Sequence, residues 1–221
     1  MTTGPADLTS IDAIIFDCDG VLVDSEGLAW QAWTDVLAQQ GVEVTASDVE
    51  MLTGGSQQRV YDAFAERSLL PPFATVARAV DALTRRLITE DLQAFEDARE
   101  ALNELRPRRI PLGVATASGR ARLDATLQAV GMAEVFDITV AGDEVARPKP
   151  APDLYLAAAS ALSAHPARCI AVEDTATGIA SARSAGMFVV GVARHHVQPS
   201  QLREAHDVVH RLTARDVLIG F

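Results

Sequence analysis

Near the N-terminus the chain reads Ile14-Ile15-Phe16-Asp17-Cys18-Asp19-Gly20. Its apolar residues follow one another without alternation, which is typical of a strand covered on both faces, as in a parallel sheet. Two acids, Asp17 and Asp19, follow directly. The carboxyl ends of parallel strands form the edge at which open α/β sheets bind ligands. The stretch therefore predicts a buried first strand that delivers two carboxylates to a functional edge.

Similar apolar runs recur along the chain and predict five further strands, at residues 111–115, 138–141, 169–172, 188–192 and 207–212. Between them, apolar residues at helical spacing predict helices at residues 120–130, 153–161 and 177–185. Strands that alternate with helices indicate an α/β domain with a doubly wound, Rossmann-like parallel sheet.

One segment, residues 24–94, interrupts this alternation because it contains only helical patterns. Gly54-Gly55 and Pro71-Pro72 punctuate it. We therefore expect two domains: a catalytic core made of residues 1–23 and 95–221, and an inserted helical cap made of residues 24–94. The cap would lie over the carboxyl ends of the strands.

The composition excludes several classes of function. A net charge of −11 over 221 residues disfavours nucleic acid or an anionic membrane as a partner, since both require basic patches. No apolar run approaches the roughly 18 residues of a membrane span. Cys18 and Cys169 lie in apolar runs, which fits reduced thiols better than a disulfide or a zinc site. We expect a cytoplasmic protein, and a monomer whose site is completed within one chain.

Polar side chains gather where the predicted strands end. Because those ends meet at one edge, we expect one site to contain Asp17, Asp19, Thr116, Lys149, Glu173 and Asp174. Taken singly, each of these residues has an ordinary explanation, such as a turn, a helix cap or a solvated surface charge. Together they place four carboxylates in one crevice, where a bound cation would relieve their repulsion. Oxygen ligands without nearby His or Cys favour Mg²⁺.

This set of residues suits phosphoryl transfer. A carboxylate can attack phosphorus and form an acyl-phosphate, which makes Asp17 the candidate nucleophile. Asp19, two residues later, can protonate the leaving oxygen and then deprotonate the attacking water. Lys149, Thr116 and the metal can hold the oxygens of the transferred group.

The same residues resemble the four motifs of the haloacid dehalogenase superfamily, in its phosphatase and phosphomutase branch with a small helical cap. The motifs are Phe16-Asp17-Cys18-Asp19-Gly20, Val114-Ala115-Thr116-Ala117-Ser118, Lys149-Pro150-Ala151-Pro152-Asp153 and Glu173-Asp174-Thr175-Ala176-Thr177. They occur in the family's order, and the resemblance covers about residues 11–212.

The resemblance implies a role for each residue. Asp17 is nucleophile and metal ligand, and Asp19 is general acid/base with its backbone carbonyl on the metal. The phosphoryl group is held by Thr116, the amide of Ala117 and Lys149. Asp174 and Glu173 complete the Mg²⁺ site.

Within this branch the resemblance favours a phosphatase of a sugar or sugar-acid phosphate, with a β-phosphoglucomutase-like mutase as the alternative. The mutase has a cap histidine at the position of Ala29. It also has an arginine in the loop after its Gly-x-Ser segment, where this chain has Gln57 and its nearest arginine is Arg59. Both departures favour hydrolysis. The segment Gly54-Gly55-Ser56-Gln57 falls where the family's specificity loop lies, and a plain turn between helices is an equal interpretation.

A phospho-accepting receiver module is a third interpretation, because receivers also combine acids, Thr and Lys on an α/β sheet. In receivers the phosphate goes to a separate Asp after the third strand, whereas here the acceptor candidate is Asp17. Receivers are also much shorter and lack an inserted helical segment.

Overall fold

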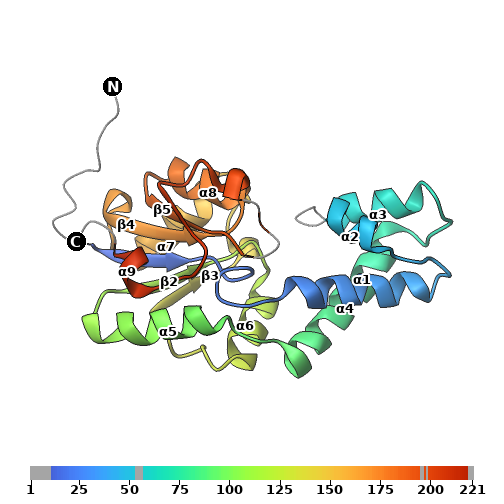
Figure 1. Cartoon of the computed structure of the whole chain (residues 1–221), viewed down its shortest axis with the longest axis horizontal. Coiled ribbons are helices and arrows are strands. Elements are labelled where there is room, and N and C mark those ends of the chain that lie inside the picture. Colours follow the sequence, from blue (N-terminus) through green and yellow to red (C-terminus); the bar gives the residue numbers. More distant parts are fainter. Residues whose placement is uncertain (1–10, 53–56, 195–196, 198, 219–221) are drawn as a thin grey trace. The chain divides into compact units, whose positions relative to one another are not determined.

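The computed structural model describes residues 11–52, 57–194, 197 and 199–218. The chain divides into two compact units. One consists of the chain up to Asp24 together with Gln93 onward, and the other is Ser25–Leu92. Figure 1 shows strands only in the first of these units.

The first unit contains a six-stranded sheet in the order β3-β2-β1-β4-β5-β6, in which every pair of neighbours is parallel. β1 occupies the middle, and its last residue, Phe16, aligns with Val114 of β2 and Val172 of β4. The strand bounds are β1 Ala13–Phe16, β2 Leu112–Ala115, β3 Ile138–Val140, β4 Cys169–Glu173, β5 Phe188–Val192 and β6 Asp207–Val209. The predicted α/β class with a parallel sheet is confirmed.

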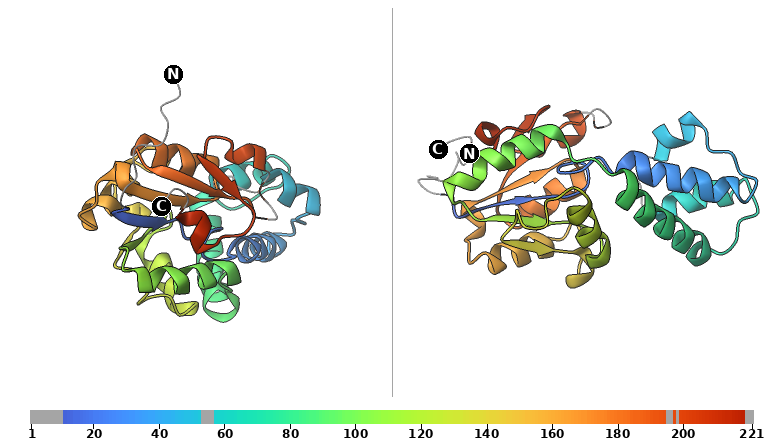
Figure 2. Two further views of the ribbon diagram at one scale, coloured as in Figure 1. Left: turned by 60° about the vertical axis from the view of Figure 1, so that its left-hand side comes forward. Right: turned by 90° about the horizontal axis from the view of Figure 1, so that it is seen from below.

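Helices cover both faces of this sheet, and Figures 1 and 2 show α5 and α9 on the opposite side from α7 and α8. Their bounds are α5 Glu96–Leu105, α6 Arg120–Ala129, α7 Asp153–Ala161, α8 Ala176–Ser184 and α9 Ala214–Val217. Because side chains alternate along a strand, Ala13 and Ile15 of β1 pack against α7 and α8, while Ile14 and Phe16 point to the other face. All four residues are fully buried, which explains the uninterrupted apolar run.

The second unit is an all-helical body of four helices among its described residues, with bounds α1 Glu26–Ala38, α2 Ala46–Leu52, α3 Gln57–Ala65 and α4 Phe73–Asp91. Its core gathers around Trp33, Leu37, Phe64 and Val80. Burial of such large side chains stabilises by about 1.5–3 kcal/mol each, which gives this unit a core of its own.

The two segments that join the units run side by side within the first unit. The amide of Asp24 donates to the carbonyl of Gln93 at 3.0 Å, and the amide of Phe95 donates to Leu22 at 3.0 Å. Val23 and Ala94 form an antiparallel bridge between them. Both segments therefore enter or leave the first unit at one place, close to the turn that follows β1. Among the described residues, no helix has the length and apolar character needed to cross a bilayer.

Candidate active site

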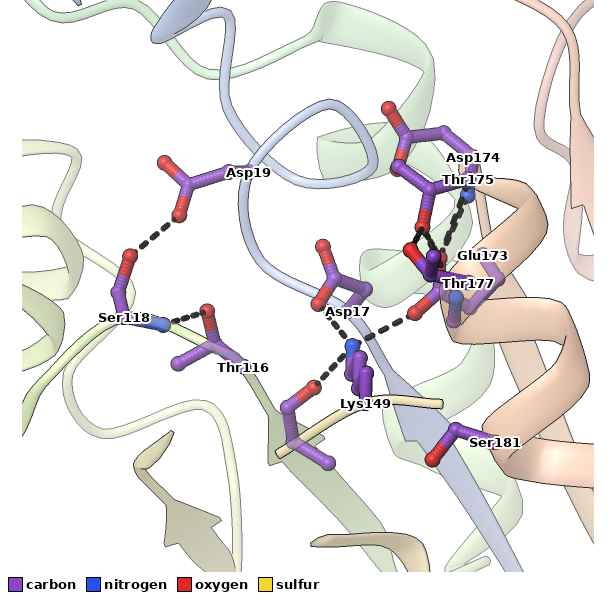
Figure 3. A network of polar contacts seen from close by, with 12 residues as sticks. Asp17, Asp19, Thr116, Ser118, Lys149, Glu173, Asp174, Thr175, Thr177 and Ser181 are labelled. Atoms are coloured by element: carbon purple, nitrogen blue, oxygen red, sulfur yellow. Dashed lines mark hydrogen bonds and ion pairs between the residues drawn. The ribbon is translucent and has the colours of Figure 1, made fainter. Parts of the chain in front are cut away.

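Lys149 lies at the centre of a buried charge cluster at the carboxyl ends of β1 and β4 (Figure 3). Its Nζ donates to Oδ1 of Asp17 at 2.6 Å and to Oε1 of Glu173 at 2.6 Å. It also donates to the carbonyl of Ala115, the last residue of β2, at 3.1 Å. One ammonium thus links three neighbouring strand ends. It is the only lysine in the sequence, in which every other permanent cation is arginine.

Burial controls the protonation of this cluster. It raises the pKa of Asp17 to about 7, with a further rise from Glu173, although the Lys149 ammonium opposes it. Burial and the carboxylates of Glu173 and Asp17 also raise the pKa of Asp174. Burial alone would lower the pKa of Lys149, but Asp17 and Glu173 hold it above its ordinary value. Without a further cation, three acids share one buried positive charge.

Glu173 is fully buried and accepts hydrogen bonds at both carboxylate oxygens. Oε1 accepts from Lys149 and from the hydroxyl of Tyr155 at 2.9 Å, while Oε2 accepts from the amide of Asp174 and from the amide and hydroxyl of Thr175. Five donors exceed the roughly four lone-pair positions of a carboxylate. Glu173 therefore anchors Lys149 in this arrangement, and would have to release a donor to bind a metal directly.

Asp174 carries the feature that best fits a metal. Its Oδ1 is buried and has no hydrogen-bond partner. One oxygen from each of Asp17, Glu173 and Asp174 lies within 4.8 Å of the others. A buried, unpartnered carboxylate oxygen is costly unless a cation or donor meets it. The donor set is all oxygen, as hard cations such as Mg²⁺ prefer.

Two glycines leave the space that these carboxylates occupy. A Cβ on Gly20, where φ is +80°, would lie 1.8 Å from Oδ2 of Asp174. A Cβ on Gly178 would lie 1.7 Å from Oε1 of Glu173. Glycine is therefore required at both positions by close approach, and at Gly20 also by its left-handed backbone.

The side chain of Asp19 is turned toward β2 rather than toward Asp17 (Figure 3). Its Oδ2 accepts from the hydroxyl of Ser118 at 2.8 Å, and its Oδ1 accepts from Nη2 of Arg122 at 3.0 Å. Both carboxylate oxygens are thus occupied by donors from the loop after β2 and the first turn of α6. To protonate a leaving group, Asp19 must give up at least one of these two hydrogen bonds.

The loop after β2 places the predicted phosphate-binding residues. Oγ1 of Thr116, a buried residue, accepts from the amide of Ser118 at 3.1 Å, and Ala117 between them is exposed. The amide of Gly142 donates to the carbonyl of Ser118 at 2.8 Å. A Cβ on Gly142 would lie 2.3 Å from the carbonyl oxygen of Ala117, so the loop depends on this close approach.

Of the four residues in the candidate specificity segment, Gly54, Gly55 and Ser56 lie outside the described residues. Gln57 begins α3, and its side-chain amide donates to Asp81 of α4 at 2.7 Å. This bond joins two helices of the all-helical unit.

Sequence reasoning missed Ser118, Arg122 and Tyr155 as members of this network. Each lies close to a predicted residue: Ser118 two positions after Thr116, Arg122 one helical turn further, and Tyr155 six positions after Lys149. The available signal was membership of the second motif for Ser118, and proximity to a motif for Arg122 and Tyr155. Which of the neighbouring side chains turns toward the site depends on helix phase and packing.

The chain is similar to several known proteins. Residues 14–192 match the family model described as haloacid dehalogenase-like hydrolase. The chain is 34% identical over 206 residues to validoxylamine A 7'-phosphate phosphatase of Streptomyces hygroscopicus subsp. limoneus, covering 90% of this chain and 93% of that protein.

Two further matches differ in extent. The chain is 30% identical to the chloroplastic protein SUPPRESSOR OF QUENCHING 1 of Arabidopsis thaliana over 99% of its own residues, but spans 22% of that protein. A crystal structure from Thermotoga maritima, provisionally described as a beta-phosphoglucomutase, superposes with a TM-score of 0.81 at 27% identity and covers 94% of this chain and 97% of that chain.

Proposed function

Because this chain belongs to the haloacid dehalogenase-like hydrolases, we propose that it is a magnesium-dependent phosphatase of small phosphomonoesters that works through an aspartyl-phosphate on Asp17. Its relatives include phosphatases of phosphorylated sugars and sugar-like compounds, which supports a sugar or sugar-acid phosphate as the substrate class. One observation carries the proposal. Lys149 holds Asp17 within a buried cluster of acids that includes an unpartnered oxygen of Asp174.

In the first proposed step, a carboxylate oxygen of Asp17 attacks phosphorus. The ester P–O bond breaks, and its electron pair leaves with the departing oxygen, which takes a proton from Asp19. Lys149, the hydroxyl of Thr116 and the amide of Ala117 stabilise the negative charge on the transferred group.

In the second step, Asp19 takes a proton from water as the water oxygen attacks the acyl-phosphate. The P–O bond to Asp17 breaks, which releases inorganic phosphate and restores the carboxylate. Throughout, Glu173 holds Lys149 in place through their 2.6 Å contact.

We propose that Asp17, Asp174 and the backbone carbonyl of Asp19 hold the Mg²⁺, while direct ligation by Glu173 stays a prediction. When bound, Mg²⁺ supplies positive charge to the phosphoryl oxygens and balances the clustered acids. A role of the all-helical unit as a substrate-selecting cap, a monomeric state and a cytoplasmic location also stay predictions.

The test is phosphate release from a panel of sugar phosphates, phosphoglycolate, nucleotides and 4-nitrophenyl phosphate, with Mg²⁺ and then with chelator. Asp17→Asn is expected to lower kcat by a factor on the order of 10³ or more, since it removes the nucleophile. Asp124→Asn is the matched control, because Asp124 lies on α6 with its side chain 61% exposed. Full activity of Asp17→Asn, or turnover in chelator, contradicts the proposal.

The mutase alternative is tested in the same series. β-Glucose 1-phosphate is supplied with a bisphosphate primer, and products are separated. A phosphatase accumulates free phosphate and glucose, whereas glucose 6-phosphate would redirect the assignment to a phosphomutase.

A further inference from the structure

Arg194 is a buried cation that the mechanism above does not use. It lies two residues after the end of β5, and 6% of its side chain is exposed. Nη1 donates to Oδ2 of Asp97 at 2.6 Å, and the guanidinium carbon lies 3.8 Å from the ring centroid of Phe95. Removing a guanidinium from water is costly unless all its surroundings compensate, so the position of this residue requires an explanation.

The remaining donors of Arg194 reach the turn that follows Asp19. Nε donates to the carbonyl of Gly20 at 3.2 Å, and Nη2 donates to the carbonyl of Val21 at 2.9 Å. Within this turn, the amide of Gly20 donates to the carbonyl of Val23, and the amide of Leu22 donates to that of Cys18. Arg194 therefore binds two consecutive carbonyls of the segment that carries Asp19 out of the sheet.

Asp97 holds Arg194 in this orientation. It lies in the first turn of α5, and its Oδ2 also accepts from the amide of Leu212 at 2.8 Å. Phe95, two residues earlier, donates its amide to Leu22 of the same turn. The guanidinium thus connects the end of β5, the start of α5 and the turn after β1.

This arrangement suits positioning better than stability. A buried ion pair is weak support for stability, because well-packed apolar residues often replace it at no cost. Apolar packing would hold the segments together but would not fix the direction of the Gly20 and Val21 carbonyls. The rigid, planar fork of arginine does so, because its donors point in fixed directions.

We propose that Arg194, held by Asp97, is a positioning residue that fixes the turn after Asp19 and so sets where the Asp19 carboxylate meets the leaving oxygen. This inference rests on the proposed phosphatase mechanism, in which Asp19 protonates that oxygen. In this assignment Arg194 and Asp97 do not touch the substrate or the reacting atoms, and act only through Asp19.

The inference predicts a loss that depends on the leaving group. A sugar alkoxide needs the proton from Asp19, whereas 4-nitrophenolate is a stable anion and leaves without it. When Asp19 is misplaced, kcat/KM falls by about 100-fold for a sugar phosphate, in the range of general acid catalysis, and by about fivefold or less for 4-nitrophenyl phosphate. A general loss of structure would lower both values alike.

The experiment compares Arg194→Lys with wild type on the best sugar phosphate and on 4-nitrophenyl phosphate. Lysine keeps the charge beside Asp97 but cannot reach the carboxylate and both carbonyls together. Arg168→Lys is the matched control, because Arg168 pairs with Asp12 at 2.8 Å with 53% of its side chain exposed. Asp97→Asn is a second variant in case Arg194→Lys fails to fold, because it loosens Arg194 indirectly. Its kcat/KM should also fall more for the sugar phosphate than for 4-nitrophenyl phosphate, but by a smaller factor than in Arg194→Lys.

A second readout does not need turnover. Hydrogen exchange at the amides of Gly20 and Leu22 is expected to be about 10-fold faster in Arg194→Lys than in Arg168→Lys, since the turn loses two carbonyl contacts. Unchanged exchange, or equal losses on both substrates, overturns the role of Arg194. A wild type that hydrolyses neither substrate contradicts the proposed function instead, and the exchange result then decides the positioning of the turn independently.

Discussion

The hydroxyl of Tyr155 donates to Oε1 of Glu173 at 2.9 Å, and both side chains are fully buried. The same oxygen accepts from Lys149. Burial, together with the neighbouring Glu173, raises the pKa of Tyr155 well above its usual range, so the phenol stays a donor at every physiological pH. Tyr155 therefore fixes the carboxylate that holds the active-site ammonium.

Tyr155→Phe is expected to lower kcat about fivefold and to lower the free energy of unfolding by about 1 kcal/mol, the usual net value of one hydrogen bond. Steady-state kinetics and denaturant unfolding measure the two effects. Tyr61→Phe is the control, since the hydroxyl of Tyr61 donates to the carbonyl of Pro71 within the all-helical unit. If both variants lose stability but keep full kcat, Tyr155 has no part in placing Lys149.

Gly178→Ala is expected to displace the carboxylate of Glu173, because the added Cβ would lie 1.7 Å from Oε1. Overpacking of this kind costs about 1–3 kcal/mol of stability. Because Lys149 moves with Glu173, we also expect a loss of kcat on the order of 100-fold, in the range seen when one charge-stabilising group is removed.

Gly27→Ala is the comparison for that variant, since nothing lies within 4 Å of a Cβ at this position on α1. It should keep both stability and phosphate release. Wild-type activity in Gly178→Ala would show that the carboxylate of Glu173 can move without consequence.

Lys149 can be observed alone because the chain has no other lysine. Protein grown with ¹³C-labelled lysine should give one Cε signal. In metal-free protein we expect its titration midpoint above the ordinary lysine pKa of about 10.4, because Asp17 and Glu173 outweigh the effect of burial. In Asp17→Asn, where one carboxylate is lost, the midpoint should fall. A midpoint at or below the ordinary value in wild type would mean that the ammonium is not held between the two acids.

The clustered acids also predict how pH changes the response to metal. Burial raises the pKa of Asp17 to about 7, so between about pH 4 and pH 7 this carboxyl holds more of a proton in the metal-free folded protein than in the unfolded chain. The contribution of Asp17 to stability therefore falls as pH rises through this window. Bound Mg²⁺ requires the ionised acids and offsets their repulsion. The rise in Tm on adding Mg²⁺ should therefore be larger at about pH 8 than at about pH 5.

Thermal unfolding with saturating MgCl₂, against NaCl of equal ionic strength, measures this difference. Asp17→Asn should show a smaller shift with less dependence on pH. Equal shifts at the two pH values in wild type would contradict a metal site that includes Asp17.

The sheet and the gathering of acids could be predicted from sequence because both follow from local patterns. Uninterrupted apolar runs such as Ile14-Ile15-Phe16 require a strand covered on both faces, and parallel strands necessarily bring their carboxyl ends to one edge. Asp17, Lys149 and Asp174 could therefore be grouped before any contact was known. The helical character of residues 25–92 was equally visible in its periodicity.

Other relationships were decided only in the tertiary structure. Arg194 and Asp97 are 97 positions apart, and Asp19 and Arg122 are 103 apart. No local pattern indicates that these side chains meet, because their contact depends on how β5, α5 and α6 pack around the turn after β1. The sequence by itself determined which chemical groups reach the sheet edge, because strand direction settles that. Only the packed structure decided which donor each carboxylate faces. A hydrogen bond requires a suitable angle and a donor–acceptor distance correct to within a few tenths of an ångström, and both depend on how the side chains pack.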